Sequence, residues 1–401
     1  MKIMVIAIYL LMELFEYFLV YLNYKNRNAP LPDNVKDVYD EETYAKQKAY
    51  EMDNLRLGIV SGLLGLAVTL VVLGFDLHSV FFYMLGIESM YLRVYFMFIM
   101  VALISLPLGI IFGAIKTFKI EAKYGFNKST VGTFIGDIIK EQLISAVLML
   151  GLISLFMLLH GAIGNMVFVA FFFVLVAVML FIIFFFHFFS KLFNKFVPIE
   201  EGELKDRIDE LSLRTGFPVK KIFSMDGSKR STKANAYFAG FGRNRVIVLY
   251  DTLIEKCTVD EIIAVLAHEI GHAKKRHTLM SAPLRFGAMA ILLLVGYFVV
   301  NQVSISTAFG FSELNIAFNF LILTIFVSPI FALWSIPVSA VSRAFEYDAD
   351  KFVAEHASSE ALISALKKLH RDSYANLTPH PFVVLVQYSH PPLTQRIAAL
   401  Y

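Results

Sequence analysis

The chain has 401 residues, of which 57% are hydrophobic and 17% are charged. Soluble domains contain roughly 45–50% apolar and 25% charged residues, so this composition excludes an ordinary soluble domain and indicates a membrane protein. The formal net charge of +3 is too small to indicate a nucleic-acid partner. The one cysteine, Cys257, excludes an intramolecular disulfide and a cluster of zinc-binding thiolates, as expected for a reducing compartment.

Stretches of about 20 apolar residues, the length that crosses a hydrocarbon core of about 30 Å, recur along the chain. In the first of them Glu13 and Glu16 interrupt the apolar run and no small-residue cleavage site follows, so we expect a retained span rather than a signal peptide. The seven predicted membrane helices are Ile3–Tyr21, Leu57–Leu77, Val94–Ile115, Leu143–Leu159, Met166–Phe189, Met280–Val300 and Phe318–Val341.

The basic residues are distributed unequally across these spans. Almost every Lys and Arg falls in connections on one side, whereas the opposite side carries only Lys2 and Arg93. Because cytoplasmic loops hold the excess of Lys and Arg, we expect the amino terminus outside and the carboxy terminus in the cytosol. The predicted fold class is a mainly α-helical polytopic membrane protein with seven transmembrane helices.

Two polar segments lie on the predicted cytosolic side. In the first, residues 198–278, the runs KANAYFAG and RVIVLY alternate and are joined across FGRN, which predicts a β-hairpin. The second is the tail that begins with SRAFEYDADKFVAEH. We therefore divide the chain into residues 1–192, with the first five spans, and residues 193–401, with the last two spans and both polar segments.

The stretch CTVDEIIAVLAHEIGHAKKRH predicts a helix that carries a metal site. Thr258 followed by Glu261 is a capping-box pattern for the helix start. His268 and His272 are four residues apart and share a helix face, with Glu269 beside them. This His-Glu-x-x-His pattern holds zinc with two neutral imidazoles and places a carboxylate near the reacting water.

A catalytic zinc usually has a third protein ligand and one open position. Past the last two spans, Glu346 is the first carboxylate that returns to the side of the zinc helix, and Gly271 would let another element approach that helix closely. Asp350 shares a helix face with Glu346 and is expected to accept a hydrogen bond from a liganding histidine. The reverse assignment of these two acids stays open. Asp348 and Glu355 are expected to be ordinary solvated acids.

The remaining chemistry requires a proton acceptor and a group that stabilises the oxyanion. We assign the first role to Glu269, the second to His390, and the role of an ion-pair partner of a site carboxylate, near the substrate, to Arg396. The cluster Lys274 to Arg276 is either a membrane-boundary anchor or a steering patch for substrate. The histidines expected to be structural are His277, His356, His370 and His380.

The run Asn235, Ala236, Tyr237 is expected to form an edge strand. A substrate in extended form could add to such an edge by β-augmentation, with the side chain of Asn235 holding the substrate backbone. The run could equally belong to an ordinary hairpin, and its period-two pattern does not separate these readings.

These residues together resemble the type I CAAX prenyl proteases, which are integral-membrane zinc peptidases. The resemblance extends over the segments IEAKYGFNKST, PIEEGELKDRI, DGSKRSTKANAYFAGFG, VIVLYDTLI, SRAFEYDADKFV and YSHPPLTQRI. It implies seven helices around a water-filled chamber, a cytosolic zinc-peptidase lobe with a small sheet, and one zinc per chain. His268, His272 and Glu346 would be the ligands, Glu269 the base, and Asp350, Asn235 and His390 would lie at or near the site.

The resemblance also implies the substrate. Family members remove the last three residues from Cys-a-a-X tails that carry an isoprenoid, so the expected partners are a protein with an extended carboxy-terminal tail and membrane lipid. Ser342 stands where many peptidases of the wider class have Asn, and the compact chain looks more like a bacterial member, which places it in a bacterial inner membrane, or in the endoplasmic reticulum if eukaryotic.

Three other readings compete with this one. A heat-shock-type membrane metallopeptidase shares the zinc signatures but has fewer spans and lacks the YGFNKST segment. A site-2-type protease would need a zinc helix within the bilayer, whereas three cations follow HEIGHA at once. A non-catalytic membrane scaffold or lipid-binding chamber would have no need of Glu269 and a full ligand set.

Overall fold

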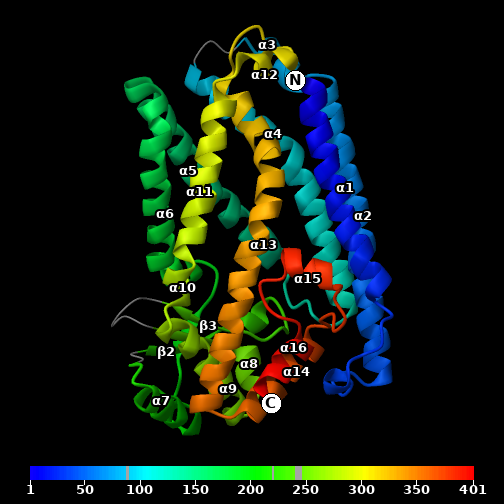
Figure 1. The fold of residues 1–401 in the computed structure, drawn as a ribbon, viewed down its shortest axis with the longest axis vertical. Coiled ribbons are helices and arrows are strands. Elements are labelled where there is room, and N and C mark those ends of the chain that lie inside the picture. The colour runs from blue at the N-terminus through cyan, green and yellow to red at the C-terminus, as the bar shows by residue number, and fades with distance from the viewer. Residues whose placement is uncertain (87–89, 219–220, 240–245) are drawn as a thin grey trace.

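The structure, a computed structural model, describes the whole chain except residues 87–89, 219–220 and 240–245. Long helices run along one axis, and a smaller lobe with a sheet lies at one end of them (Figure 1). The carboxy terminus lies in this lobe, and the amino terminus lies at the opposite, far end. The long helices are α1 (Lys2–Asn26), α2 (Glu41–Gly74), α4 (Met90–Ala114, continued by the π-helical η2, Ile115–Glu121), α5 (Val131–Ile163), α6 (Val167–Ser190), α11 (Ala282–Val300) and α13 (Ile316–His356).

Each of the seven predicted spans corresponds to one long helix. Six segments of the described chain are long and apolar enough to cross a membrane. One of them, Val131–Phe185, contains α5 and most of α6, which are joined through the short helix η3 (Gly164–Met166). The mainly helical, multi-pass fold predicted from the sequence is therefore confirmed.

Helix α13 connects the far end to the lobe without a break. The side chain of Asn315 caps its first turn by accepting a hydrogen bond from the N–H of Phe318 at 2.9 Å, and the helix continues for 41 residues to His356. At about 1.5 Å per residue, α13 is about 60 Å long. Its predicted apolar span ends at Val341, so the polar segment that follows extends the same helix into the lobe.

The lobe contains a four-stranded sheet with the strand order β1-β2-β4-β3. β3 and β4 pair antiparallel, as the predicted hairpin requires, while the predicted turn FGRN lies outside the described residues. The sheet is larger than this hairpin, because β2 pairs parallel with β4 and β1 pairs antiparallel with β2. The strands are β1 (Phe196–Pro198), β2 (Lys221–Met225), β3 (Ala236–Ala239) and β4 (Val246–Tyr250).

Helix α9 begins at the predicted capping box. The hydroxyl of Thr258 accepts from the N–H of Glu261 at 3.3 Å, and the Glu261 carboxylate accepts from the N–H of Thr258 at 2.8 Å. The shorter helices are α7 (Glu203–Thr215), α8 (Asp251–Lys256), α9 (Val259–Lys274), α10 (His277–Met280), α14 (Ser359–Asp372), α15 (Pro381–Gln387) and α16 (Leu393–Leu400) in or near the lobe, and α3 (Leu77–Met84) and α12 (Val303–Ala308) at the far end.

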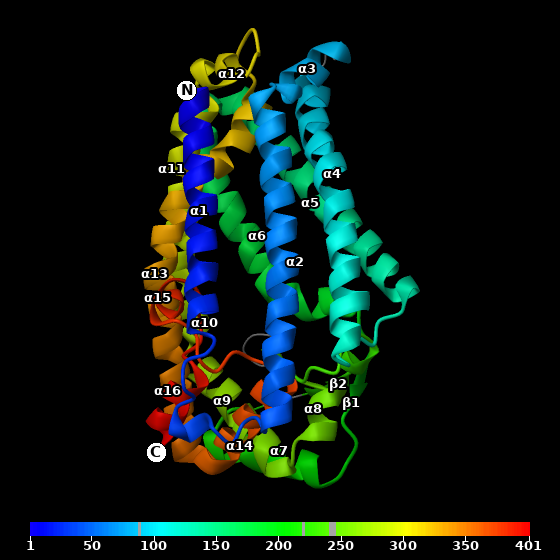
Figure 2. The same ribbon diagram turned by 90° about the vertical axis from the view of Figure 1, so that its right-hand side faces the viewer.

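Two apolar cores lie at opposite ends of the molecule. In the lobe, side chains of α9, α14, α16 and β4 pack with the last turns of α13, and the segment after α1 adds Val35 and Tyr39. At the far end, side chains of α3, α5, α6 and α12 pack around Phe318 of α13. Figure 2 shows α1, α2 and α4 running between these two ends. α13 belongs to both cores and holds the lobe in a fixed relation to the membrane helices.

Candidate metal centre

Helices α9 and α13 pack closely in the lobe because α9 carries glycine at the contact. A Cβ atom at Gly271 would lie 3.1 Å from the Cβ of Phe352 and 3.3 Å from the Cα of Ala349. The backbone of α13 could not give way to such an atom without moving the helix. The close approach expected at Gly271 is confirmed, and it brings together the metal-binding candidates of two helices that are distant in sequence.

Three ligand side chains, His268, His272 and Glu346, form what we call the ligand triangle between these helices. The Nε2 atoms of His268 and His272 are 3.1 Å apart, and they lie 3.4 Å and 3.3 Å from the two carboxylate oxygens of Glu346. Zinc bonds of roughly 2.0–2.2 Å in tetrahedral geometry place ligand atoms roughly 3.3 Å apart. The spacing of the three groups is therefore close to the spacing that zinc ligands require.

The carboxylate of Glu346 also has an unused acceptor. Its Oε2 atom is buried and accepts no hydrogen bond of adequate geometry from the described residues, and its nearest donors, Nε2 of His268 and a guanidinium nitrogen of Arg396, lie 3.4 Å away. A buried polar atom without a partner costs free energy unless something else satisfies it. A cation between Glu346 and the two imidazoles would satisfy this oxygen, so the donor set and its burial fit a metal as well as the distances do.

His268 is held from behind by what we call the Asp350 arm, Asp350 and Arg396. The Nδ1 atom of His268 lies 2.9 Å from the Asp350 carboxylate. Arg396 donates two hydrogen bonds, of 2.6 Å and 2.9 Å, to the same carboxylate. Both side chains are buried, with 2% of Asp350 and 8% of Arg396 exposed. Burial alone would lower the pKa of His268, but the carboxylates of Asp350 and Glu346 outweigh it and raise the pKa to about 8.

His272 is held by a longer chain of contacts, which we call the Asp348 arm: His277, Asp348 and Lys275. The Nδ1 atom of His272 lies 2.9 Å from Nδ1 of His277, whose Nε2 lies 3.2 Å from Asp348. Lys275 pairs with Asp348 at 2.5 Å. The ring of His277 stacks on Phe345 at a centroid distance of 4.2 Å. If His272 binds metal through Nε2, its Nδ1–H donates to His277, and the Nε2–H of His277 donates to Asp348.

Sequence reasoning missed this second arm. It treated His277 as structural and Asp348 as a solvated acid, because neither falls at a helical spacing from the zinc histidines. The chain turns after α9 at Arg276, which has the left-handed φ of 58°. That turn folds His277 back behind His272. A left-handed Arg leaves no pattern in the sequence, although a third histidine five residues after HEIGH was a signal that could have prompted the question.

Glu269 lies next to the ligand triangle on α9. Burial raises the pKa of its carboxyl above the usual range, while the nearby imidazoles of His268 and His272 act in the opposite direction. A carboxylate whose pKa is moved up toward neutrality is a better proton acceptor and donor than a fully solvated one. The position and the environment of Glu269 therefore suit proton transfer.

His390 approaches the ligand triangle from the tail. Its Nε2 atom lies 3.4 Å from Oε1 of Glu346, its Nδ1 atom is hydrogen-bonded to the hydroxyl of Ser389 at 2.9 Å, and its side chain is 67% exposed. Partial burial and the nearby charge of Arg396 lower the pKa of His390. The ring is thus an accessible polar group at the edge of the site.

The run Asn235, Ala236, Tyr237 lies at the edge of the sheet. β3 is the last strand in the sheet order and packs beside α9. The amide oxygen of Asn235 accepts from the N–H of Ala236 at 2.9 Å, and the Asn235 side chain is exposed. The ring of Tyr237 packs edge-on against Tyr250. The strand is therefore positioned beside the metal helix.

Three other histidines have contacts within their own helices. The Nδ1 atoms of His356 and His370 lie 3.1 Å and 2.8 Å from the carbonyl oxygens of Phe352 and Leu366, and His380 caps α15. These contacts agree with the structural roles expected for them.

Comparison with known proteins gives the same picture over the whole chain. The sequence pattern of peptidase family M48 matches residues 198–401, and that of the CAAX prenyl protease N-terminal domain, with five membrane helices, matches residues 20–195. The chain is 33% identical to CAAX prenyl protease 1 homolog of Arabidopsis thaliana, over 99% of this chain and 96% of that protein. It is 30% identical to CAAX prenyl protease 1 of Saccharomyces cerevisiae, over 96% and 92% of the two chains.

A solved structure shares the fold. The crystal structure of S. mikatae Ste24p superposes with a TM-score of 0.93 at 29% sequence identity, and the match covers 100% of this chain and 98% of that one. All three relatives are eukaryotic proteins, so these comparisons give no support to the bacterial origin expected from the compact sequence.

Proposed function

This chain belongs to peptidase family M48 and to the CAAX prenyl proteases, and from that premise we propose which residues perform its reaction and on which side of the membrane. The protein is an integral multi-pass membrane protein and a zinc metallopeptidase that acts on CAAX-tailed proteins. The observation that carries the assignment of roles is the ligand triangle, whose atoms have the spacing that zinc requires.

His268, His272 and Glu346 hold one zinc ion in this proposal. When bound, zinc polarises the scissile carbonyl and acidifies the attacking water. The Asp350 arm and the Asp348 arm each fix the ring orientation and the tautomer of one histidine ligand. This arrangement agrees with the general finding that liganding histidines donate their second N–H to a carboxylate or another acceptor.

Glu269 and His390 carry out the proton transfer and the charge stabilisation. Glu269 accepts the proton of the attacking water and returns it to the amine of the leaving peptide. His390 donates a hydrogen bond to the oxyanion that develops on the scissile carbonyl, and its exposed ring beside Glu346 supports this role. Arg396 acts through Asp350, and its burial supports a positioning role rather than a direct contact with substrate.

The substrate tail adds to the edge of β3 in this proposal. Asn235, Ala236 and Tyr237 offer backbone groups beside α9, and an extended peptide on that edge would run past the ligand triangle. An edge strand next to a zinc helix supports this placement. The partners are thus a protein with an extended carboxy-terminal tail and the lipid around the membrane helices, with no role for nucleic acid.

The orientation and the division of the chain follow from the same proposal. The amino terminus lies outside and the lobe lies in the cytosol, because the basic residues gather on the side of the lobe. The amino-terminal part, with the first five spans, ends near residue 192, and the two matched family patterns meet nearby, between residues 195 and 198, which supports that boundary. A eukaryotic endoplasmic reticulum is the membrane that agrees with the eukaryotic relatives.

The test compares Glu269→Gln with wild type and with Glu355→Gln, a matched change at an exposed acid of α13. Release of the carboxy-terminal tripeptide from CAAX-type peptides and zinc content per chain are measured. Wild type and Glu355→Gln should cleave, whereas Glu269→Gln should keep its zinc and lose roughly 10²–10⁴-fold in rate. Equal cleavage by all three proteins would defeat the assignment. Zinc-loaded wild type that cleaves nothing would favour a non-catalytic scaffold.

A further inference from the structure

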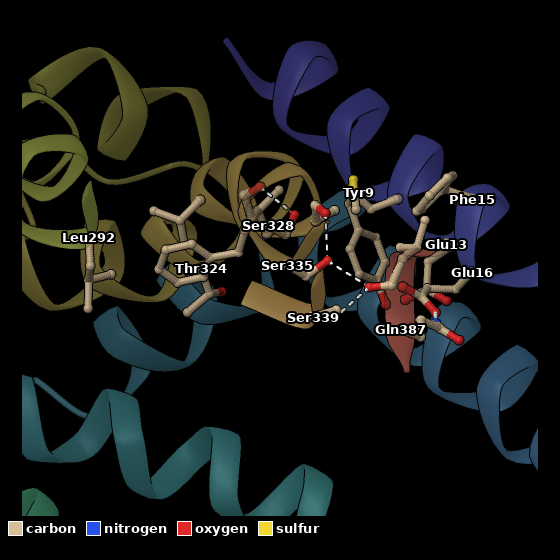
Figure 3. Close-up of a pocket in the computed structure, with 16 residues that line it drawn as sticks. Tyr9, Glu13, Phe15, Glu16, Leu292, Thr324, Ser328, Ser335, Ser339 and Gln387 are labelled. Atoms are coloured by element: carbon tan, nitrogen blue, oxygen red, sulfur yellow. Dashed lines mark hydrogen bonds between the residues drawn. The ribbon is translucent and has the colours of Figure 1, made fainter. Parts of the chain in front are cut away.

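A pocket of about 790 Å³ lies among α1, α11, α13 and α15 (Figure 3). Its lining residues on α1, α11 and α13 all belong to segments that are long and apolar enough to cross a membrane. Most of its wall is apolar, and Figure 3 shows side chains of α1, including Tyr9 and Glu13, facing Ser335 and Ser339 of α13. None of these residues has a part in the reaction described above.

The wall that α13 contributes to the pocket carries small side chains, and its hydroxyl groups already have hydrogen-bond acceptors. Ser328, Ala332 and Ser335 are small side chains on one face of the helix. The hydroxyls of Ser328 and Ser335 donate to the carbonyls of Ile325 and Ala332 at 2.9 Å and 2.7 Å. Because both hydroxyls have backbone carbonyls as acceptors, the wall presents mainly carbon atoms to the pocket, as an apolar ligand requires.

The wall on α1 has a different character. Tyr9, Glu13 and Glu16 share one face of α1 and line the pocket, whereas the strongly exposed apolar residues Leu11 and Leu14 lie on the other face. Ionisable side chains at membrane depth face a protein interior or a water-filled cavity rather than lipid. The ionisable residues on this wall therefore favour a pocket on the interior side of α1 rather than on its lipid-facing side.

Helix α13 links the pocket to the metal centre. Ser339, Ser335 and Ser328 precede Glu346 by whole helical turns to within roughly 20°, so they point in nearly the same direction as this ligand. At about 1.5 Å per residue, Ser339 lies about 10 Å and Ser328 about 27 Å from Glu346 along the helix axis. The pocket therefore begins within reach of the site and leads away from it into the membrane part.

The tail gives a second connection. Val386 and Gln387 line the end of the pocket nearest the lobe, and the carbonyl of Val386 accepts from Ser335 at 3.1 Å. Gln387 donates to Glu16 at 3.0 Å. The chain then leads directly to His390, whose ring lies beside Glu346. Two separate elements thus join the pocket to the groups around the scissile bond.

We propose that this pocket receives the isoprenoid chain attached to the cysteine of a prenylated CAAX tail. Removal of the last three residues makes that cysteine the residue that supplies the scissile carbonyl. The isoprenoid chain therefore branches from the peptide next to the metal centre. It needs an apolar space that adjoins this centre. The polar face of α1 would meet the hydrated peptide, while the carbon-rich face of α13 would meet the lipid. This inference rests on the proposed function, because it takes its substrate from there.

A second apolar pocket, of about 740 Å³ between α5 and α6, is the alternative location. Its wall comes from those two helices and Phe193, and it includes no residue of α9, α13 or the tail. A lipid in that pocket would have no path along the elements that carry the ligand triangle. We therefore favour the pocket beside α13.

The first experiment fills the pocket with Ala332→Phe. The matched control is Ala340→Phe, a change at an exposed position of α13 outside the pocket lining. Peptides of one sequence carry a farnesyl, a geranylgeranyl or an S-methyl group on the cysteine. Ala332→Phe should lower kcat/KM for the farnesylated peptide at least about tenfold more than for the S-methyl peptide, with a larger ratio for geranylgeranyl. Ala340→Phe should change the three values alike.

The second experiment locates the lipid directly and does not depend on turnover. The Glu269→Gln protein is crosslinked to a peptide whose isoprenoid carries a diazirine, and the adducts are mapped by mass spectrometry. Adducts within residues 9–16 or 324–339 are expected. Adducts confined to α5 and α6, or equal losses on all peptides with Ala332→Phe, would overturn the proposal. Wild type that cleaves none of the peptides would instead count against the proposed function itself.

Discussion

The Asp350 arm and the Asp348 arm each orient one histidine ligand, but they differ in how deeply they are buried. Asp350 reaches His268 directly and is only 2% exposed, and its partner Arg396 is buried with it. Asp348 reaches His272 only through the ring of His277, and it is 44% exposed beside a Lys275 that is 32% exposed. One arm thus lies inside the lobe core, and the other lies at its surface.

This difference decides what each arm contributes. Charges in a buried pair are little screened, and removing one partner leaves the other uncompensated. Charges in an exposed pair interact weakly and are screened further by salt. We therefore expect the Asp350 arm to be essential both for folding and for metal binding, and the Asp348 arm to adjust the position of one ligand.

The largest effect is expected when the Asp350 arm is broken. Asp350→Ala leaves Arg396 buried without its partner and His268 without an acceptor for Nδ1–H. Losing one member of a buried pair costs roughly 3–5 kcal/mol, so the variant should unfold at lower temperature and lose most of its zinc. Thermal unfolding and elemental analysis check this, with Glu355→Gln as the control. An Asp350→Ala protein with full zinc content and an unchanged unfolding temperature would remove the distinction between the arms.

The second prediction concerns zinc affinity, which should depend on pH through the protonation of His268. In the metal-free protein the pKa of His268 is raised to about 8, and zinc requires the neutral ring. Apparent zinc affinity should therefore fall up to about tenfold for each pH unit below 8. The stability of the metal-free fold changes with pH in the opposite direction. The protonated ring of His268 stabilises this fold at pH values below about 6.5, and that stabilisation is lost as pH rises through 8.

Chelator competition between pH 6 and 9 measures this dependence. Asp350→Asn removes the carboxylate that helps raise the pKa of His268, so the break in the profile should move to lower pH. A profile that is flat over this range in the wild-type protein would contradict the assignment of the proton to His268.

A smaller effect is expected when His277, which links His272 to Asp348 in the Asp348 arm, is replaced. His277→Phe keeps an aromatic ring to stack on Phe345 but removes the acceptor for Nδ1–H of His272. Loss of an outer partner of a metal ligand typically costs about 10–100-fold in metal affinity or activity, and we expect the lower end here. Zinc affinity and kcat are measured, together with the visible spectrum of the cobalt-substituted protein, which reports ligand geometry. His277→Gln, which restores an acceptor, should recover part of the loss.

The smallest effect is expected at the exposed end of the same arm. Asp348→Asn removes the charge that faces Lys275 while leaving an oxygen for His277. An exposed ion pair contributes about 0.2–1 kcal/mol, so zinc affinity should fall by no more than a few-fold. The change should shrink further at high salt. A loss as large as that of Asp350→Ala would show that exposure does not separate the arms.

Sequence patterns led to one arm and missed the other for a physical reason. Asp350 follows Glu346 by one helical turn, and both lie on a helix that the span count returns to the side of His268, so period and topology are sufficient. The arm of His277 depends on the left-handed turn at Arg276, which no periodicity encodes.

The same distinction holds for the fold. The long apolar helices and the capping box of α9 are local patterns and were predicted. The strands β1 and β2 are short and pair with distant sequence, so only the hairpin of β3 and β4 was visible. The pocket beside α13 also required coordinates, since it combines side chains from four helices.

The continuous course of α13 has one further consequence, which concerns the register of Glu346. Because the same helix that crosses the membrane part also carries this ligand, the position of Glu346 in the lobe depends on the number of residues that precede it in α13. One residue inserted before Glu346 would rotate the carboxylate by about 100° and displace it by about 1.5 Å. A change in the length of α13 between its membrane segment and the lobe would therefore move Glu346 away from His268 and His272 and break up the metal centre.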